Sequence, residues 1–355
     1  MEAPALERSG LEAARYDYAV LRHALKPALK RGALIAAANW QVAFVQATAD
    51  SLFKVLIAAP VIGGIFLVAL AVGADPRTLI VLEWRELTGT IVSSLLSQPL
   101  VLTAFLLAVG VVAVGGSLFI FLIKAGTVAV LVRSDREAGP IEEPPLHVDG
   151  VARAGRFSID FYIEASRSLY PRYARLGFGL MFVYLASALA YLAYLIANRS
   201  GGGGWALTAL VTAAFVSWIT LVNFFYLLVQ IVIAADESSV VAACRRVAMF
   251  VRHDKRDVSA VFMLVLGLVV LATAASLVAA AALGLVAFVP FFGLAALPLQ
   301  LAAWLVRALV FQYLGLASIG AYLRLYRDFC LEGRLLGAPK LGTSVGGSRL
   351  TYNHD

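Results

Sequence analysis

The stretch Leu52–Ala74 (LFKVLIAAPVIGGIFLVALAVGA) decides the fold class, because Lys54 is its only charged residue. A helix needs about 20 mostly apolar residues to cross the hydrocarbon core of a bilayer, and this stretch is long enough. Five more stretches of the same character follow it, at about Leu100–Ile123, Leu176–Ala197, Trp205–Ala235, Ala260–Leu283 and Leu299–Leu323. The sequence therefore predicts an all-α fold, a polytopic integral membrane helix bundle with six transmembrane helices.

The composition excludes the soluble classes of protein. The chain has 355 residues, of which 61% are hydrophobic and 14% are charged, whereas a soluble domain carries about 25% charged residues. A soluble enzyme, a disordered chain and a disulfide scaffold are excluded on this basis. The two cysteines, Cys244 and Cys330, fall in segments predicted to be cytoplasmic, where disulfides are uncommon. Neither has the CxxC spacing of a redox or metal site.

The distribution of basic residues predicts the topology. With the N-terminus inside, the four inside segments hold 7, 8, 5 and 5 Lys and Arg residues, and the outside segments hold 3. Lys and Arg collect on the cytoplasmic side of membrane proteins, so both termini are predicted to be cytoplasmic. The net charge of +7 then belongs to faces that meet anionic lipid headgroups, and no nucleic-acid partner is expected. Arg outnumbers Lys 23 to 6, a bias that suits a GC-rich bacterial genome. The expected location is the bacterial inner (plasma) membrane.

The chain is expected to divide into three parts: a cytoplasmic arm with an amphipathic helix (residues 1–51), the six-span membrane domain (52–330) and a polar cytoplasmic tail (331–355). Apolar and charged residues alternate with helical spacing before each odd-numbered span, which predicts amphipathic helices lying in the membrane interface. These helices are expected at Leu11–Ser51, Phe157–Tyr173 and Glu237–Asp257, with another on the outer surface at Thr78–Ser97.

Two further segments are expected to be irregular. Residues 133–150 (RSDREAGPIEEPPLHVDG) are rich in Pro, Gly and charge, which predicts a flexible cytoplasmic loop with Glu142 and Glu143 in solvent. The segment Gly284–Pro298 is apolar but interrupted by Pro and Gly. It predicts a turn followed by an interfacial or re-entrant piece.

Chemistry at membrane depth needs ionisable or metal-binding groups, which are costly there. The sequence has no HExxH and no GxxxxGK[ST] motif, and no span pairs a Ser with a His, so the usual metal, phosphate and nucleophile sites are missing. No enzyme activity, cofactor or metal is therefore expected. The polar positions that stand out within the spans are Arg307, Gln300, Gln312, Asn223 and Gln230.

Arg307 has two interpretations, and the sequence leaves both open. If the sixth span begins near Leu299, Arg307 lies about 12 Å deep and needs a partner such as a carboxylate, a carbonyl or a lipid phosphate. If the span begins near Trp304, the side chain extends to the outer headgroups and serves only as an anchor. Asn223 and Gln230 share one helical face, where interhelical hydrogen bonding and a polar translocation path are both possible.

Two short stretches resemble a known family. Ala235–Val247 (ADESSVVAACRRV) follows a span, and Tyr322–Phe329 (YLRLYRDF), with Glu332-Gly333 after it, closes the last one. They resemble the membrane domain attached to some bacterial glycerophosphodiester phosphodiesterases, and a broad set of related six-span membrane proteins. The catalytic barrel of those enzymes is absent from this sequence. The resemblance therefore implies a membrane architecture and no activity.

Together these patterns predict a non-catalytic integral membrane protein, either a scaffold or subunit of a membrane complex or a component that organises lipid. The expected partners are membrane lipids, a membrane protein or a second copy of the chain. The alternative is a transporter or permease for a polar or anionic substrate, with Arg307, Asn223, Gln230 and Gln312 lining its path. A cavity at mid-bilayer reached by these four side chains favours transport, and a closed core favours the scaffold.

Overall fold

The computed structural model describes residues 25–72, 97, 99–145, 147–198, 205–287 and 292–335. Within these ranges the regular structure is helical and contains no strand. A helical run at residues 25–38 comes first and ends at the turn residue Asn39. The remaining helices are α2 (Trp40–Val72), α5 (Pro99–Ala138), α6 (Val148–Ala154), α7 (Ile159–Ala197), α8 (Trp205–Asp236), α9 (Val240–His253), α10 (Lys255–Ala287) and α11 (Phe292–Leu335).

Among the described residues, six helices are long and apolar enough to cross a membrane, which confirms the all-α fold with six spans. The chain is therefore a multi-pass membrane protein. Most of these helices exceed the length that a bilayer requires. The 44 residues of α11, for example, extend about 66 Å at 1.5 Å per residue, whereas a hydrocarbon core is about 30 Å thick. The excess length belongs to the charged end of the molecule.

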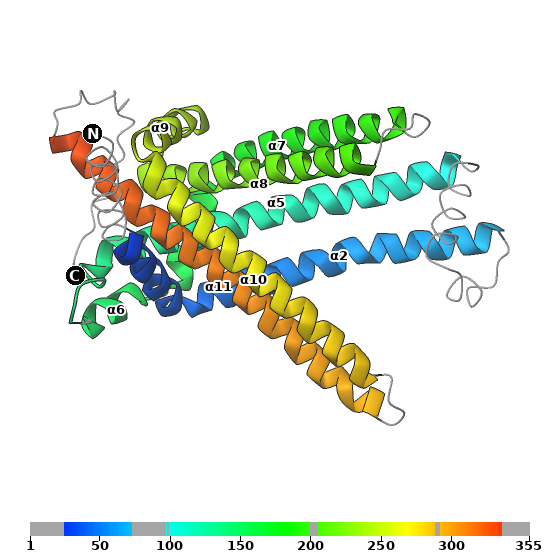
Figure 1. The fold of residues 1–355 in the computed structure, drawn as a ribbon, viewed down its shortest axis with the longest axis horizontal. Coiled ribbons are helices and arrows are strands. Elements are labelled where there is room, and N and C mark those ends of the chain that lie inside the picture. The colour runs from blue at the N-terminus through cyan, green and yellow to red at the C-terminus, as the bar shows by residue number, and fades with distance from the viewer. Residues whose placement is uncertain are drawn as a thin grey trace, which may run out of the picture.

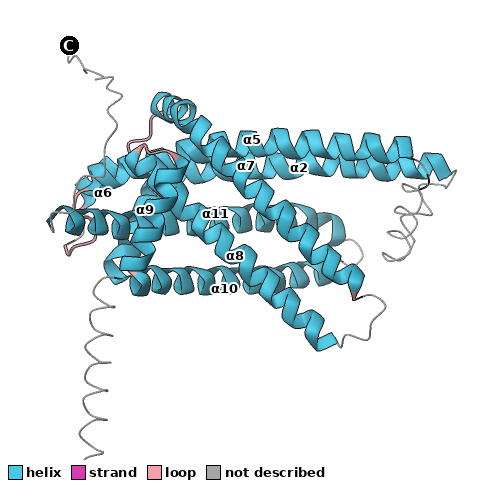
Figure 2. Ribbon diagram, turned by 90° about the horizontal axis from the view of Figure 1, so that it is seen from above, coloured by secondary structure: helices cyan, strands magenta, loops and turns pink. Residues whose placement is uncertain are grey.

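The six long helices form three antiparallel pairs, α2 with α5, α7 with α8, and α10 with α11 (Figure 1). Near α9 the pairs come together, and at the opposite end they lie apart (Figures 1 and 2). We call the end where they meet the head. It consists of residues 25–49, 121–145, 147–154, 159–177, 226–261 and 316–330.

The packed core of the described residues lies in the head. All the buried hydrophobic residues among the described ones, from Ala28 to Tyr326, fall within the ranges that define the head. Outside the head, the pairs carry many large hydrophobic side chains without cover, such as Leu107, Leu189 and Leu268, which are 67%, 57% and 41% exposed. The structure thus consists of a packed head and three apolar hairpins that diverge from it.

The expected interfacial helices are found in three different forms. The segment Glu237–Asp257 contains a separate helix, α9, whose N-terminus is capped by the Ser239 hydroxyl accepting a hydrogen bond from the Ala242 amide. The segment Phe157–Tyr173 is not a separate helix, because α7 runs through it without a break and buries Tyr173 completely. The helical run at residues 25–38 is part of the head and is separated from α2 by Asn39.

The predicted flexible loop at residues 133–150 is wrong in large part. Helix α5 continues to Ala138 and α6 begins at Val148. Between them Ile141 is fully buried, and Glu142 is 8% exposed instead of lying in solvent. The physical reason is a buried cation on the helical run at residues 25–38, described below, which pairs with this carboxylate.

The predicted interfacial or re-entrant piece at Gly284–Pro298 is helical where the structure describes it, and residues 288–291 lie outside the described residues. Helix α10 extends to Ala287 and α11 begins at Phe292 with Pro298 inside it, so both flanks are regular helix. The expected outer helix at Thr78–Ser97, apart from Ser97, and the tail after residue 335 lie outside the described residues.

Candidate functional site

The centre of the head is the guanidinium group of Arg31, which is fully buried. Its Nε donates to Asp135 Oδ1 at 2.5 Å, and its terminal nitrogens donate to Glu142 Oε2 and to the carbonyl oxygens of Asp135 and Gly139, each at 2.6 Å. One cation on the helical run at residues 25–38 thereby joins the end of α5 to the segment after it. Arg31 is 104 residues from Asp135 and 111 residues from Glu142 in the sequence.

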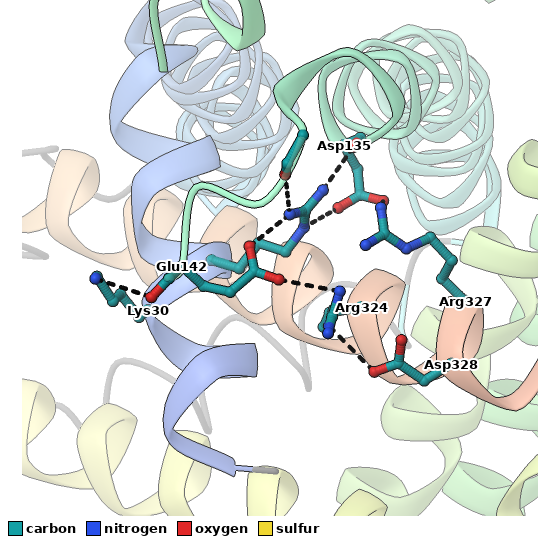
Figure 3. Close-up of polar contacts among 8 residues, drawn as sticks. Lys30, Asp135, Glu142, Arg324, Arg327 and Asp328 are labelled. Atoms are coloured by element: carbon teal, nitrogen blue, oxygen red, sulfur yellow. Dashed lines mark hydrogen bonds and ion pairs between the residues drawn. The ribbon is translucent and has the colours of Figure 1, made fainter. Parts of the chain in front are cut away.

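Two arginines of α11 complete this network (Figure 3). Arg324 lies 3.0 Å from the second carboxylate oxygen of Glu142 and 3.1 Å from Asp328, and Arg327 lies 3.5 Å from Asp135. The two buried carboxylates therefore each face two cations. We call the five residues Arg31, Asp135, Glu142, Arg324 and Arg327 the head lock.

The surroundings of the head lock favour the charged forms of Glu142 and Arg31. Burial alone raises the pKa of the Glu142 carboxyl, but a backbone hydrogen bond, Arg31 and Arg324 outweigh burial, and the net pKa is lowered. Burial likewise lowers the pKa of the Arg31 guanidinium, and the charges and hydrogen bonds of Asp135 and Glu142 outweigh it, so the net pKa is raised. A buried ion pair is stable only when such partners replace the lost water.

A glycine next to Arg31 sets the position of the head lock. A Cβ atom on Gly32 would lie 2.2 Å from the Ala317 carbonyl oxygen and 2.7 Å from the Ala321 amide nitrogen of α11. Only a residue without a side chain allows this close approach. The approach brings Arg31 within reach of α5 and of the arginines that follow on α11.

A second polar cluster joins α8, α9 and α11. Oδ2 of Asp236, at the end of α8, accepts hydrogen bonds from the Arg246 guanidinium of α9 and from the Tyr326 hydroxyl of α11. Burial lowers the pKa of Arg246, but Asp236 and then Tyr326 outweigh it, and the net pKa is raised. The two stretches that carry the family resemblance, Ala235–Val247 and Tyr322–Phe329, thus contact each other in the head.

The five polar residues predicted within the spans do not share one site. Gln300 and Arg307 line a groove of about 560 Å³ between α10 and α11. Asn223 is bonded to the Tyr184 hydroxyl of α7 and to its own helix through the Ile219 carbonyl. Gln230 is buried in the head, where its backbone carbonyl accepts from a tyrosine of α7 at 2.8 Å. Gln312 is half-buried on α11 and is not among the residues that line the groove.

Sequence reasoning missed the residues of the head lock and also Lys124. The Lys124 ammonium, within α5, lies 5.4 Å from the centroid of the Tyr226 ring of α8. Sequence alone places Lys124 at the end of the second span and counts it with the cytoplasmic charges. The signal that could have found it is its distance from the next charged residue, Arg133, since eight uncharged residues separate the two.

The described part of the chain offers no group of three or more His, Cys, Asp or Glu residues suited to a metal ion. The charged residues of the head lock and of the Asp236 cluster are occupied in pairing with one another. The arrangement can therefore hold these helices together.

Comparison with protein-family models, with curated proteins and with solved structures finds no match for this chain. The resemblance to the membrane domain of bacterial glycerophosphodiester phosphodiesterases stays a prediction. The class that the fold defines is that of an all-α, multi-pass membrane protein.

Proposed function

We propose that the protein is a non-catalytic membrane component in which the head holds three apolar hairpins apart, so that they organise lipid or a partner membrane protein between them. The observation that carries this proposal is the confinement of the described hydrophobic core to the head, with the large apolar side chains of the hairpins left uncovered. Within a bilayer, such faces pack against lipid tails or against the helices of another membrane protein.

The positions of the polar residues support the same proposal. A transporter requires them to converge on one path, but among the described residues only Gln300 and Arg307 share a groove. Asn223 is bonded to Tyr184 of α7, and Gln230 is buried in the head. An enzyme requires a nucleophile, a base and an electrophilic group in mutual reach. The charged groups of the head lock instead pair with one another, which suits a structural role.

We further propose that the head and both termini are cytoplasmic, and that the membrane is the plasma membrane of a bacterium. The bias of basic residues supports this orientation, and exposed basic side chains of the head would meet anionic headgroups. Truncations that carry a compartment reporter after Pro140 and after Gly202 test it. Opposite compartments are expected, and the same compartment for both reporters would contradict the topology.

Site-specific photo-crosslinking in native membranes tests the proposed function. A photoreactive residue at Leu107, Leu189 or Leu268 places a probe on each hairpin in turn, and the same residue at Val148, which is 69% exposed on α6 of the head, is the control. We expect the three hairpin positions to form adducts with lipid or with one membrane protein, and the control to form no lipid adduct. Crosslinks between hairpins of the same chain would contradict the proposal, because they would mean that the hairpins close on one another.

A further inference from the structure

The groove between α10 and α11 combines an apolar lining with three polar side chains that have unused hydrogen-bonding capacity. Its lining is mostly alanine, leucine and valine, and its volume of about 560 Å³ falls in the range of small-molecule and lipid sites. Ser276 from α10 faces Gln300 and Arg307 from α11 across it. Among the described residues none of these three side chains forms a hydrogen bond or ion pair, and Arg307 contacts only the ring of Phe311, at 5.8 Å from its centroid.

Arg307 lies far from both ends of its helix. Helix α11 begins at Phe292, so Arg307 is about 22 Å from its start and about 26 Å from Arg324 in the head. An arginine within a spanning segment is costly unless a partner compensates its charge, and its long side chain can extend toward the headgroups. The described residues supply no carboxylate for it, so the compensating anion must come from outside this part of the chain.

We propose that this groove binds one anionic phospholipid. The phosphate would accept charge-assisted hydrogen bonds from the planar fork of Arg307, and Gln300 and Ser276 would donate to the same headgroup. An acyl chain would extend from Arg307 toward the head along Ala272, Val310 and Phe311, which line the same groove. This inference rests on the proposed function, because it assigns Arg307 to a bound lipid and not to a translocated substrate.

Tryptophan fluorescence tests the inference directly, because Trp304 lines the groove. The chain has five tryptophans, and a variant that keeps only Trp304, with the others replaced by Phe, reports on this site. The protein is reconstituted in phosphatidylcholine vesicles that contain a small fraction of brominated phosphatidylglycerol or of brominated phosphatidylcholine. We expect the brominated phosphatidylglycerol to be enriched around Trp304 by roughly fivefold, the equivalent of about 1 kcal/mol for one cation and an anionic lipid.

A second single-tryptophan variant provides the matched control. Trp218 on α8 is 49% exposed and donates to the Ser187 hydroxyl at 3.0 Å, and it lies outside the groove. Brominated lipids of both kinds should quench Trp218 equally. Equal quenching of Trp304 by the two lipids would overturn the inference.

Three substitutions separate charge from shape. Arg307→Leu should remove the preference of Trp304 for the anionic lipid, and Arg307→Lys should retain part of it. Ala280→Leu fills the groove without changing charge, so it should reduce the quenching of Trp304 by both brominated lipids and keep the test valid if Arg307→Leu does not fold. Retention of the full preference in Arg307→Leu would contradict the proposed role of the guanidinium.

Aqueous iodide distinguishes failure of this inference from failure of the proposed function. If Trp304 is quenched by iodide, the groove is a water-filled path, and the non-transporting function is wrong. If iodide does not quench Trp304 and the two lipids quench it equally, only the lipid site is wrong. Inorganic phosphate added to the vesicles should leave the lipid preference unchanged, because the site recognises the phosphate of a membrane-bound lipid.

Discussion

Replacing Arg31 by Met should destabilise the head strongly, because it removes the buried cation at the centre of the head lock. Methionine retains much of the volume and the helix propensity of arginine, so the change acts mainly on charge and hydrogen bonding. It deletes four hydrogen bonds of 2.5–2.6 Å. The carboxylates of Asp135 and Glu142, whose side chains are 6% and 4% exposed, are left short of one partner each.

The magnitude follows from which partners remain. Removing one member of a buried ion pair costs about 3–5 kcal/mol. Arg324 at 3.0 Å from Glu142 and Arg327 at 3.5 Å from Asp135 still compensate part of the negative charge that loses Arg31 as its partner. We therefore expect a loss at the lower end of that range, about 3 kcal/mol, in the free energy of unfolding.

The control is a pair of the same chemistry on the surface. Arg133 lies 2.8 Å from Glu137 one turn away on α5, and the two side chains are 43% and 38% exposed. Such a pair is worth about 0.3–0.5 kcal/mol, and the contact of Arg133 with the Phe161 ring at 4.6 Å adds about 0.5–1 kcal/mol. Arg133→Met should thus cost at most about 1.5 kcal/mol.

Reversible unfolding by sodium dodecyl sulfate in mixed micelles, followed by circular dichroism, measures both variants. The double variant of Arg31→Met with Glu142→Gln should cost less than the sum of the single variants, because the two residues are in direct contact. Equal losses for Arg31→Met and Arg133→Met would refute the reasoning, since the head lock would then contribute no more than a surface pair.

Three further predictions concern the head. Gly32→Ala should destabilise it by about 1–3 kcal/mol or more, because the new Cβ meets the backbone of α11, whereas Gly267→Ala, with nothing within 4 Å, should be neutral or stabilising; the same unfolding assay compares them. Lowering the pH below 4.5, the ordinary pKa of a glutamate carboxyl, should weaken the head, because the pKa of Glu142 is lowered in the folded state. The contribution of ionised Glu142 to the free energy of unfolding is present above pH 4.5 and is lost as the pH falls through the lowered pKa of the folded state. Glu142→Gln should flatten this dependence when unfolding is measured from about pH 6 to about pH 3. Tyr326→Phe should cost about 1.5–3 kcal/mol, because it removes a hydrogen bond to the charged Asp236, and an unchanged unfolding midpoint would show that this bond contributes nothing.

The six spans could be predicted because hydropathy is a local property. Each span is a continuous run of apolar residues, and its count needs no knowledge of the neighbours. The boundaries could not be predicted in the same way. Helices α5, α7 and α11 continue far into charged sequence, since their polar ends pack on one another in the head, and a hydropathy pattern ends where charge begins.

The head lock could not be predicted because its members are distant in the sequence. Glu142 is followed by another glutamate and two prolines, a composition typical of a solvated loop, and nothing local shows that Arg31 comes within 2.6 Å of it. The one local hint is the pair Arg31-Gly32 within an amphipathic helix, where a glycine indicates a close approach. Of the residues predicted within the spans, Gln300 and Arg307 meet in one groove because they are seven residues apart on one helix, a spacing that places them on the same face.

Water accessibility of the intramembrane polar positions tests the central claim, that the hairpins enclose no aqueous path, most directly. Single cysteines at Asn223, Gln230, Gln312 and Arg307 are introduced after Cys244 and Cys330 are changed to serine, and intact cells are treated with a membrane-impermeant thiol reagent, with permeabilised cells as the second arm. We predict that cysteines at 223 and 312 stay unlabelled in both arms and that a cysteine at 230 stays unlabelled inside the packed head. A cysteine at 307 should stay unlabelled because the groove around it is lined mainly by apolar side chains. Labelling of three or more of these positions, in a continuous order from one side of the membrane, would contradict the account and favour a transporter.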